Sequence, residues 1–323
     1  MTAIFWLMLI TFLSHFFFQN MMAHIRYATV GEVTMENVHP FVRELHGMNI
    51  SFCHNGECPR FAQAPLPKLG RTTSHFYQPV GDTDSEAVFC SLLNALRTEY
   101  PTQLPPLPEL YETLERLCYE IVATEHNYQP SSSSSSEHEN ITKNHNSQNQ
   151  PQASSSMPTI FNFLLGLGPT TLLAYSWPGS RPGSKVWNGL HYIVREPPFT
   201  TAQLIDDEDE NGFIDFSTVT TLDDRVVVVT TKPLTNEAGW KEVPKGKLVL
   251  FERGHVYWTK QDILTAYQHG FAVPLPDNHE LDRRRGGDGV LDDSSDSIMA
   301  ISDGEEDDSS LMEQQRPHAV SMG

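Results

Sequence analysis

The stretch SFCHNGECPRF, residues 51–61, gathers the side chains most capable of chemistry. Cys53 and Cys58 bracket a His-Asn-Gly triplet. This pattern suggests a metal site, a cysteine nucleophile with a histidine base, or a turn whose backbone N–H groups take part in the chemistry. A structural zinc site needs about four ligands, and no second Cys/His pair stands at such spacing. Adjacent strand residues point to opposite faces, so Cys53 and His54 would share neither a metal nor a proton. We therefore expect no metal and no cofactor.

The Asn55-Gly56 pair favours the third interpretation. Glycine adopts positive φ readily, so we expect a turn at the end of a strand here. Such a turn can aim the Gly56 N–H and the Asn55 side-chain amide at one point, as the oxyanion of amide hydrolysis requires. Taken alone, however, an Asn-Gly pair is far more often an ordinary hairpin turn.

Two helices and several strands must position these residues. Apolar residues recur at helical spacing over 84–99, after an Asp/Ser cap signal, and over 107–124. Strand-like segments lie on either side of the helices: HIRYATV (24–30), ISFCH (50–54), IFNFLLGL (160–167), TTLLAYSW (170–177), LHYIVRE (190–196), RVVVVTT (225–231), KLVLFERG (247–254) and HVYWT (255–259). Strands, then helices, then strands predict an α+β fold with two sheets and helices layered outside.

Three segments differ from the rest in composition. Residues 129–158 are rich in Ser, Asn and Gln, and we expect a disordered insertion within one domain. The tail, 276–323, holds 13 acidic and four basic residues and carries nearly half of the net charge of −19. We expect it to be disordered as well. Residues 1–22 form a leader whose apolar run, 4–18, is shorter than the roughly 20 residues of a membrane helix.

Charge and cysteine usage limit the partners and the compartment. Outside the tail the chain is only mildly acidic, and its one basic cluster, Arg283–Arg285, lies among acidic residues. Nucleic acid is therefore not an expected partner. Four cysteines without a disulfide pattern indicate a reducing compartment. We expect a cytoplasmic protein, with membrane anchoring by residues 4–18 as the alternative.

Three blocks occur in a characteristic order: HIRYATVGEVTMENVHPFVRELHG (24–47), CHNGE (53–57) and GDTDSE (81–86). With the segments after the insertion, they resemble the class II glutamine amidotransferases over about residues 23–258. The most similar subgroup contains the bacterial YafJ-like proteins and the amidotransferase-like subunit of the fungal glutathione-degradation complex. The resemblance implies an Ntn-hydrolase-like four-layer αββα sandwich, in a domain of residues 23–275 that is incomplete at its N-terminus.

The same resemblance implies a role for each matching residue. Arg26 would hold the α-carboxylate of glutamine or a γ-glutamyl compound as a bidentate pair. Asp84 would accept from the α-ammonium group, and Thr29 would line the strand beside the substrate. Asn55 and Gly56 would form the oxyanion hole. A peptidase or synthase subunit is the partner protein that the resemblance suggests.

One component of the family's chemistry has no counterpart in this sequence. Class II amidotransferases use a cysteine at the mature N-terminus, whose α-amino group is the general base. None of the four cysteines here is N-terminal, so we expect no hydrolysis by the chain as it stands. Two interpretations remain: a truncated copy of an active γ-glutamyl amide hydrolase, with glutathione breakdown as one reaction, or a non-catalytic module that binds an amino acid or a partner, with a possible membrane anchor.

A calcium-loop pattern at residues 207–218 offers a competing function. Asp207, Asp209, Asn211, Gly212 and Asp215 match the EF-hand loop, but Thr218 stands where a bidentate Glu is needed. The sequence that follows predicts a strand where the motif requires a helix. We expect no calcium binding.

Overall fold

The computed structural model describes residues 20–25, 33–73, 75–128, 159–205, 212–218, 220–221 and 224–270. The chain divides into two units, Met1–Glu280 and Leu281–Gly323, and every described residue lies in the first. Most of the leader, the whole insertion and the whole tail therefore lie outside the described residues.

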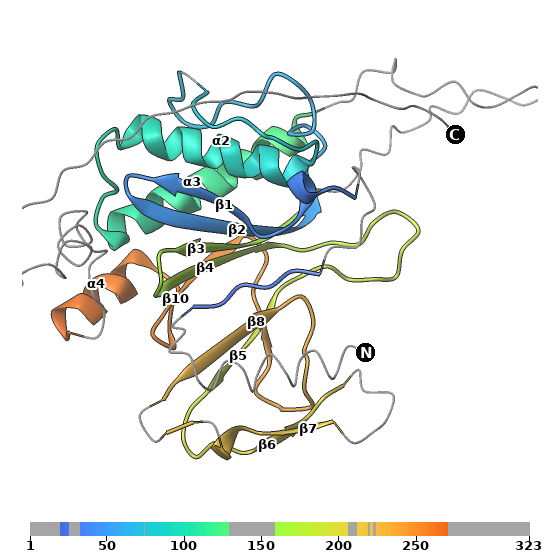
Figure 1. Ribbon diagram of the computed structural model, residues 1–323, viewed down its shortest axis with the longest axis vertical. Helices are drawn as coiled ribbons and strands as arrows, with labels where there is room; N and C mark the ends of the chain where they lie inside the picture. Colours follow the sequence, from blue (N-terminus) through green and yellow to red (C-terminus); the bar gives the residue numbers. More distant parts are fainter. Residues whose placement is uncertain are drawn as a thin grey trace, which may run out of the picture. The chain divides into compact units, whose positions relative to one another are not determined.

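A six-stranded antiparallel sheet forms the centre of this unit (Figure 1). In spatial order its strands are β1 (Phe41–Leu45), β2 (Met48–Glu57), β3 (Ile160–Leu167), β4 (Thr171–Trp177), β10 (Lys247–Glu252) and β11 (His255–Tyr257). β1 was not among the strand-like segments expected from the sequence. Its hairpin with β2 turns at His46 and Gly47, which both have positive φ, as a two-residue turn matched to strand twist requires.

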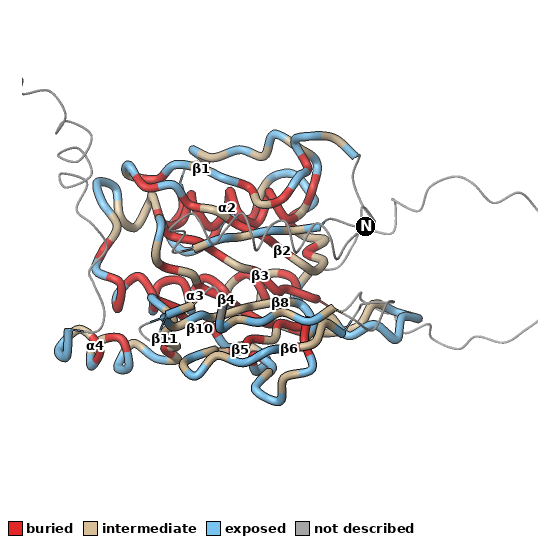
Figure 2. The backbone as a smooth tube through the Cα atoms, turned by 60° about the horizontal axis from the view of Figure 1, so that its bottom comes forward, coloured by how far each residue is buried: buried red, intermediate tan, exposed pale blue. Residues whose placement is uncertain are grey.

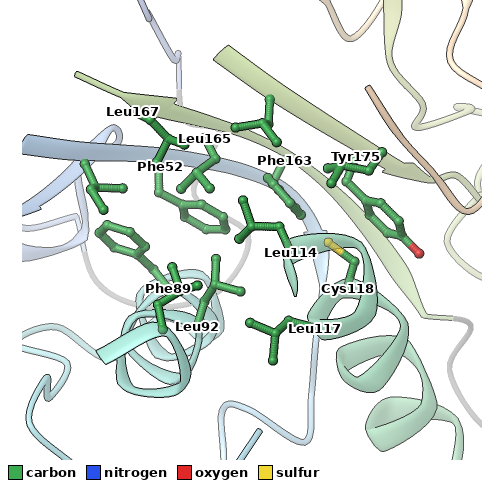
Figure 3. Packing of buried hydrophobic residues seen from close by; sticks show 14 of the residues in the cluster. Phe52, Phe89, Leu92, Leu114, Leu117, Cys118, Phe163, Leu165, Leu167 and Tyr175 are labelled. Atoms are coloured by element: carbon green, nitrogen blue, oxygen red, sulfur yellow. The ribbon is translucent and has the colours of Figure 1, made fainter. Parts of the chain in front are cut away.

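Two long helices cover one face of this sheet. α2 (Asp84–Glu99) and α3 (Leu107–His126) confirm both helices expected from apolar spacing. Thr83 caps α2 by accepting the Glu86 N–H at 3.3 Å, and a proline pair precedes α3. Their apolar faces meet every second residue of the central strands, as Figure 3 shows for Phe89 and Leu114 against Phe52, Phe163 and Leu165.

The other face of the sheet packs on a second, smaller sheet. This sheet has the order β8 (Val226–Thr230), β5 (His191–Arg195) and β9 (Lys241–Glu242). The contact uses the alternate residues of the same central strands, so that Ala174, Val249 and Phe251 meet Tyr192 and Leu190. A further pair, β6 (Thr201–Gln203) and β7 (Phe213–Asp215), lies near β5 in Figure 1.

The mixed α/β architecture expected from the sequence is confirmed. Three of the expected layers are seen in the described residues: the helices, the large sheet and the small sheet. Figure 2 shows that burial is concentrated in α2, α3 and the central strands. The remaining elements are α4 (Lys260–Gln268), which was not expected, and two short 3-10 helices, Met35–Asn37 and Phe216–Thr218.

Two further expectations bear on the described chain. None of its helices combines the length and the apolar character needed to cross a membrane. Of the calcium-like run, residues 207–211 lie outside the described part, whereas Phe213–Asp215 pair with β6 as a hairpin. The strand expected after that run is β8.

Candidate functional site

Asn55 and Gly56 lie inside strand β2, close to its end at Glu57. They pair with Asn162 and Phe161 of β3, and Gly56 does not have a positive φ. The turn that we expected at this pair is therefore wrong. The reason is that β2 continues its pairing with β3 through Glu57, so the backbone stays extended.

Glycine is needed at position 56 for a different reason, which is close approach. A Cβ built there would lie 1.9 Å from the carbonyl oxygen of Ile160 and 2.7 Å from Nε2 of His54. The first distance is far below any real contact, and its partner is backbone that cannot swing aside. The residue type thus lets β2 and the start of β3 come together beside His54.

Asn55 lies on the face of β2 that points away from the helices. Its neighbours Phe52 and His54 point to the helix side, where His54 Nδ1 lies 2.9 Å from the hydroxyl of Ser85 in α2. By the alternation of a strand, Cys53 and Asn55 point to the opposite side. The backbone carbonyl of Asn55 accepts a hydrogen bond from Nδ2 of Asn162 at 3.1 Å.

Asp84 is brought to the same end of β2 by helix α2. It is the first residue of that helix, and its Oδ2 accepts the backbone N–H of Cys58 at 2.7 Å. Cys58 follows Gly56 by two positions, so the carboxylate is tied directly to the segment that carries the expected oxyanion hole. Among the expected site residues, the structure thus brings together Asn55, Gly56 and Asp84.

The loop before Asp84 is held by Glu86, which the sequence analysis did not single out. Glu86 accepts the N–H groups of Val80 at 3.1 Å and Gly81 at 2.7 Å, and its other oxygen pairs with Arg43. The signal was present, because Thr83 and Glu86 have the T-x-x-E spacing of a capping box. In this case the glutamate fixes the loop that precedes the helix.

A second carboxylate, Glu125, holds the segment that follows Cys58. It lies in the last turn of α3 and accepts the N–H groups of Arg60 and Phe61, at 3.0 Å and 3.3 Å. Burial raises the pKa of Glu125 to about 7, although these two N–H groups act to lower it. The helix expected over 107–124 stopped one residue short of Glu125, and its role depends on a contact that the sequence does not show.

All four cysteines are unpaired and buried. Burial raises the pKa of Cys53 and of Cys90 to about 12, and raises those of Cys58 and Cys118 well above their usual range. A cysteine nucleophile reacts as the thiolate and needs access to its substrate. The environment of each of these thiols disfavours that form.

His54 is equally unsuited to exposed acid–base work. Its side chain is buried, and burial lowers the pKa of the imidazole against the opposing effect of the Asp84 carboxylate. The ring packs between Phe52 and Phe161. The expectation that Cys53 and His54 occupy opposite faces is confirmed. Arg26 and Thr29 lie outside the described residues, so the other half of the expected substrate clamp stays a prediction.

Comparison with known proteins places this geometry in a family. A model described as class II glutamine amidotransferases matches residues 13–128 and 134–270. A Haemophilus influenzae protein assigned to the glutamine amidotransferases is 33% identical over 235 residues, which are 73% of this chain and 60% of that protein. YafJ of Escherichia coli, which has the same assignment, is 31% identical over 232 residues, covering 72% of this chain and 69% of YafJ.

A solved structure extends the comparison. It comes from Pseudomonas aeruginosa, has the same assignment, is 30% identical and covers 72% of this chain and 69% of that one, with a TM-score of 0.48. The chain spans only about three fifths of the Haemophilus protein. The matched ranges contain the whole of the described site around Asn55, Gly56 and Asp84. This chain belongs to the class II glutamine amidotransferases, and it is similar to their YafJ-like members.

Proposed function

We propose that this chain binds glutamine, or a compound with a γ-glutamyl group, at the end of β2. The observation that carries the proposal is the 2.7 Å hydrogen bond between the Cys58 N–H and Asp84. It places a half-buried carboxylate within two residues of Gly56. In the family's mode of binding, Asp84 takes the α-ammonium group, Arg26 takes the α-carboxylate, and the γ-carbonyl reaches Asn55 and Gly56.

The charge pattern suits an amino acid better than an uncharged amide. A carboxylate at one point and a guanidinium at another recognise both charged groups of the glutamyl end, and each charge-assisted bond is stronger than a neutral one. The γ-amide is then directed toward the Gly56 segment. Asp84 and Arg26 would recognise only this glutamyl half, so glutamine and glutathione are both candidate ligands within the proposal.

We further propose that none of the four cysteines of this chain hydrolyses the bound amide. The support is their burial, which disfavours the thiolate of each. An oxyanion hole and a clamp without a nucleophile bind a substrate but form no acyl-enzyme. The chain is then a binding module of the amidotransferase family, acting alone or with a partner subunit. The unpaired cysteines suit a reducing compartment such as the cytoplasm.

Calorimetry of the 323-residue protein with glutamine tests the binding proposal. We expect Asp84→Asn to weaken binding by roughly tenfold or more, because the amide still accepts the Cys58 N–H but no longer pairs with an ammonium group. The matched control is Asp82→Asn, which removes the same charge from the same loop and keeps an oxygen for Asn37. Equal effects of the two variants, or no binding by the unaltered protein, would refute the proposed site.

Release of ammonia from glutamine, or of cysteinylglycine from glutathione, measured on the same protein, tests the second part. We expect none above the rate of the ligand in buffer. Release that disappears in Cys53→Ala or in Thr2→Ala would identify a nucleophile and overturn the binding-only proposal, while leaving the location of the site intact.

A further inference from the structure

Asn162, on the face of β3 that points away from the helices, links three separate parts of the chain. Its Nδ2 donates to the carbonyl of Asn55 at 3.1 Å and to the carbonyl of Asn188 at 3.2 Å. Its Oδ1 accepts from the hydroxyl of Ser176 in β4 at 2.8 Å. Asn162 and Ser176 are both fully buried. The bond between Asn162 and Ser176 is therefore shielded from water, whereas the two carbonyls belong to half-buried residues.

The two carbonyls fix which way the amide points. Because a carbonyl only accepts, the NH₂ group must face Asn55 and Asn188, and both of its N–H bonds are thereby used. The Ser176 hydroxyl then donates to the amide oxygen and holds the group in this orientation. An apolar residue would leave the buried hydroxyl and two half-buried carbonyls without this partner, and the buried group carries the larger cost.

The partner on the far side, Asn188, closes a loop beside the site. Residues 178–189 form a loop between β4 and β5. Reciprocal backbone hydrogen bonds between Gly179 and Asn188, at 3.1 Å and 2.9 Å, close this loop. The Asn188 carbonyl thus accepts from both Gly179 and Asn162. A second connection runs from Arg181 to Glu57, an ion pair with the residue that directly follows Gly56.

We propose that Asn162 is a positioning residue of the ligand site, which locks the Asn55–Glu57 strand end and the 178–189 loop into one geometry. The loop is then a wall of the site, fixed at Asn188 through Asn162 and at Arg181 through Glu57. This inference rests on the proposed binding of a γ-amide near Asn55. Asn162 acts on the ligand only through Asn55 and the loop, because its own polar atoms are all engaged.

Two measurements on the full chain test the proposal, and one of them needs no ligand. In hydrogen–deuterium exchange, we expect Asn162→Ala to speed exchange at least tenfold both in peptides covering 178–189 and in those covering 52–57. Ser176→Ala should give a smaller increase in the same peptides, because the amide loses its orienting partner and keeps its donors. In calorimetry, Asn162→Ala should weaken glutamine binding by at least tenfold.

The control must lose a buried hydrogen bond of the same strands at their other end. Thr171→Val does so, because its hydroxyl donates to Glu252 at 2.9 Å and is also buried. We expect this variant to be destabilised without faster exchange in 178–189 and without weaker binding. Because this variant also loses stability, it shows whether destabilisation of the sheet alone can change the exchange rates or the affinity.

The outcomes distinguish this inference from the proposed function. If Asn162→Ala changes exchange in the two regions no more than Thr171→Val does, the positioning role is wrong, whatever the protein binds. If the unaltered protein binds glutamine and Asn162→Ala binds it within twofold, the role is also wrong. If exchange rises as expected but no form of the protein binds glutamine, the linkage stands and the proposed ligand fails.

Discussion

The two faces of the six-stranded sheet are built from alternate residues of the same strands, yet they differ in character. The helix-covered face is continuous and apolar, with Phe52, Phe163 and Leu165 packed against α2 and α3 (Figure 3). The opposite face has a small apolar cluster around Phe251 and, toward the end of β2, a buried polar set around Asn162. The first face supplies most of the stability of the domain, and the second positions the backbone of the site.

The sharpest test of this contrast compares the stability of two variants, each with one phenylalanine replaced by alanine on one face of the sheet. We expect Phe163→Ala to lower the free energy of unfolding by about 4 kcal/mol, since the ring is fully buried between helices and sheet. Phe251→Ala should cost less, about 2–3 kcal/mol, because half-buried neighbours such as Val194 and Val229 can close the cavity. Urea unfolding of both variants measures the difference. Equal losses would show that the two faces share the stability evenly.

Glu125 is the one carboxylate of the helix layer whose titration should be visible in the stability. Burial raises its pKa in the folded protein to about 7, from an ordinary value of 4.5. The folded state therefore holds this proton more tightly, so its contribution to stability is complete below about pH 4.5 and is lost as the pH rises through about 7. At about 1.4 kcal/mol per pKa unit, the loss is up to about 3 kcal/mol.

Glu125→Gln should remove that dependence, because the amide keeps an oxygen for Arg60 and Phe61 without a charge. The measurement is the difference in unfolding free energy between the variant and the unaltered protein from pH 4 to pH 8. We expect the variant to gain relative stability as the pH rises. A constant difference for Glu125→Gln would contradict the raised pKa.

Gly56→Ala tests the site end of β2. The new methyl group would meet the Ile160 carbonyl, so the strands must separate, at a cost of about 1–3 kcal/mol. Glutamine binding should be lost with it. Gly270→Ala, after α4 and outside the 178–189 loop, is the control: nothing lies within 4 Å of the added Cβ, and only the positive φ opposes the change. That variant should lose about 1 kcal/mol and keep its affinity. Unchanged binding by Gly56→Ala would remove this segment from the site.

The smallest effect is expected at Tyr111, where α3 meets the edge of the sheet. Its hydroxyl lies 2.8 Å from the carbonyl of Leu248 and 2.7 Å from that of Trp258. Tyr111→Phe removes the bond and keeps the ring, so we expect a loss of about 1 kcal/mol in thermal or urea unfolding. Tyr119→Phe, on the exposed side of the same helix, should change nothing. A loss above about 2 kcal/mol would contradict this expectation, because the polar contact would then contribute as much to the free energy of unfolding as the Phe251 ring.

Sequence reasoning succeeded where the physics is local. Apolar spacing predicted α2 and α3 almost residue for residue, and β3 and β10 were marked by continuous apolar runs. It failed at β1, which the turn residues His46 and Gly47 signal, and at α4, whose N-cap Thr259 accepts the Asp262 N–H. In both cases a short local signal was present but was not supported by a long periodic pattern.

The candidate site was only partly predictable, for a physical reason. Asn55, Gly56 and Asp84 were named from motifs, and the structure brings them together. The reason for Gly56 is its approach to Ile160, and the role of Asn162 follows from its position opposite Asn55. Both depend on which residue of β3 faces which residue of β2. That register joins segments more than a hundred residues apart, and no local pattern specifies it.

The insertion between α3 and β3 begins and ends beside the same few residues. Before it, Glu125 holds the N–H groups of Arg60 and Phe61; after it, Ile160 pairs with Glu57. The free energy of closing a flexible loop changes by only about 0.6 kcal/mol when its length doubles. Residues 129–158 are thus a suitable position for inserting a foreign sequence. A fluorescent reporter or an affinity tag inserted there would be attached at both ends next to the proposed ligand site.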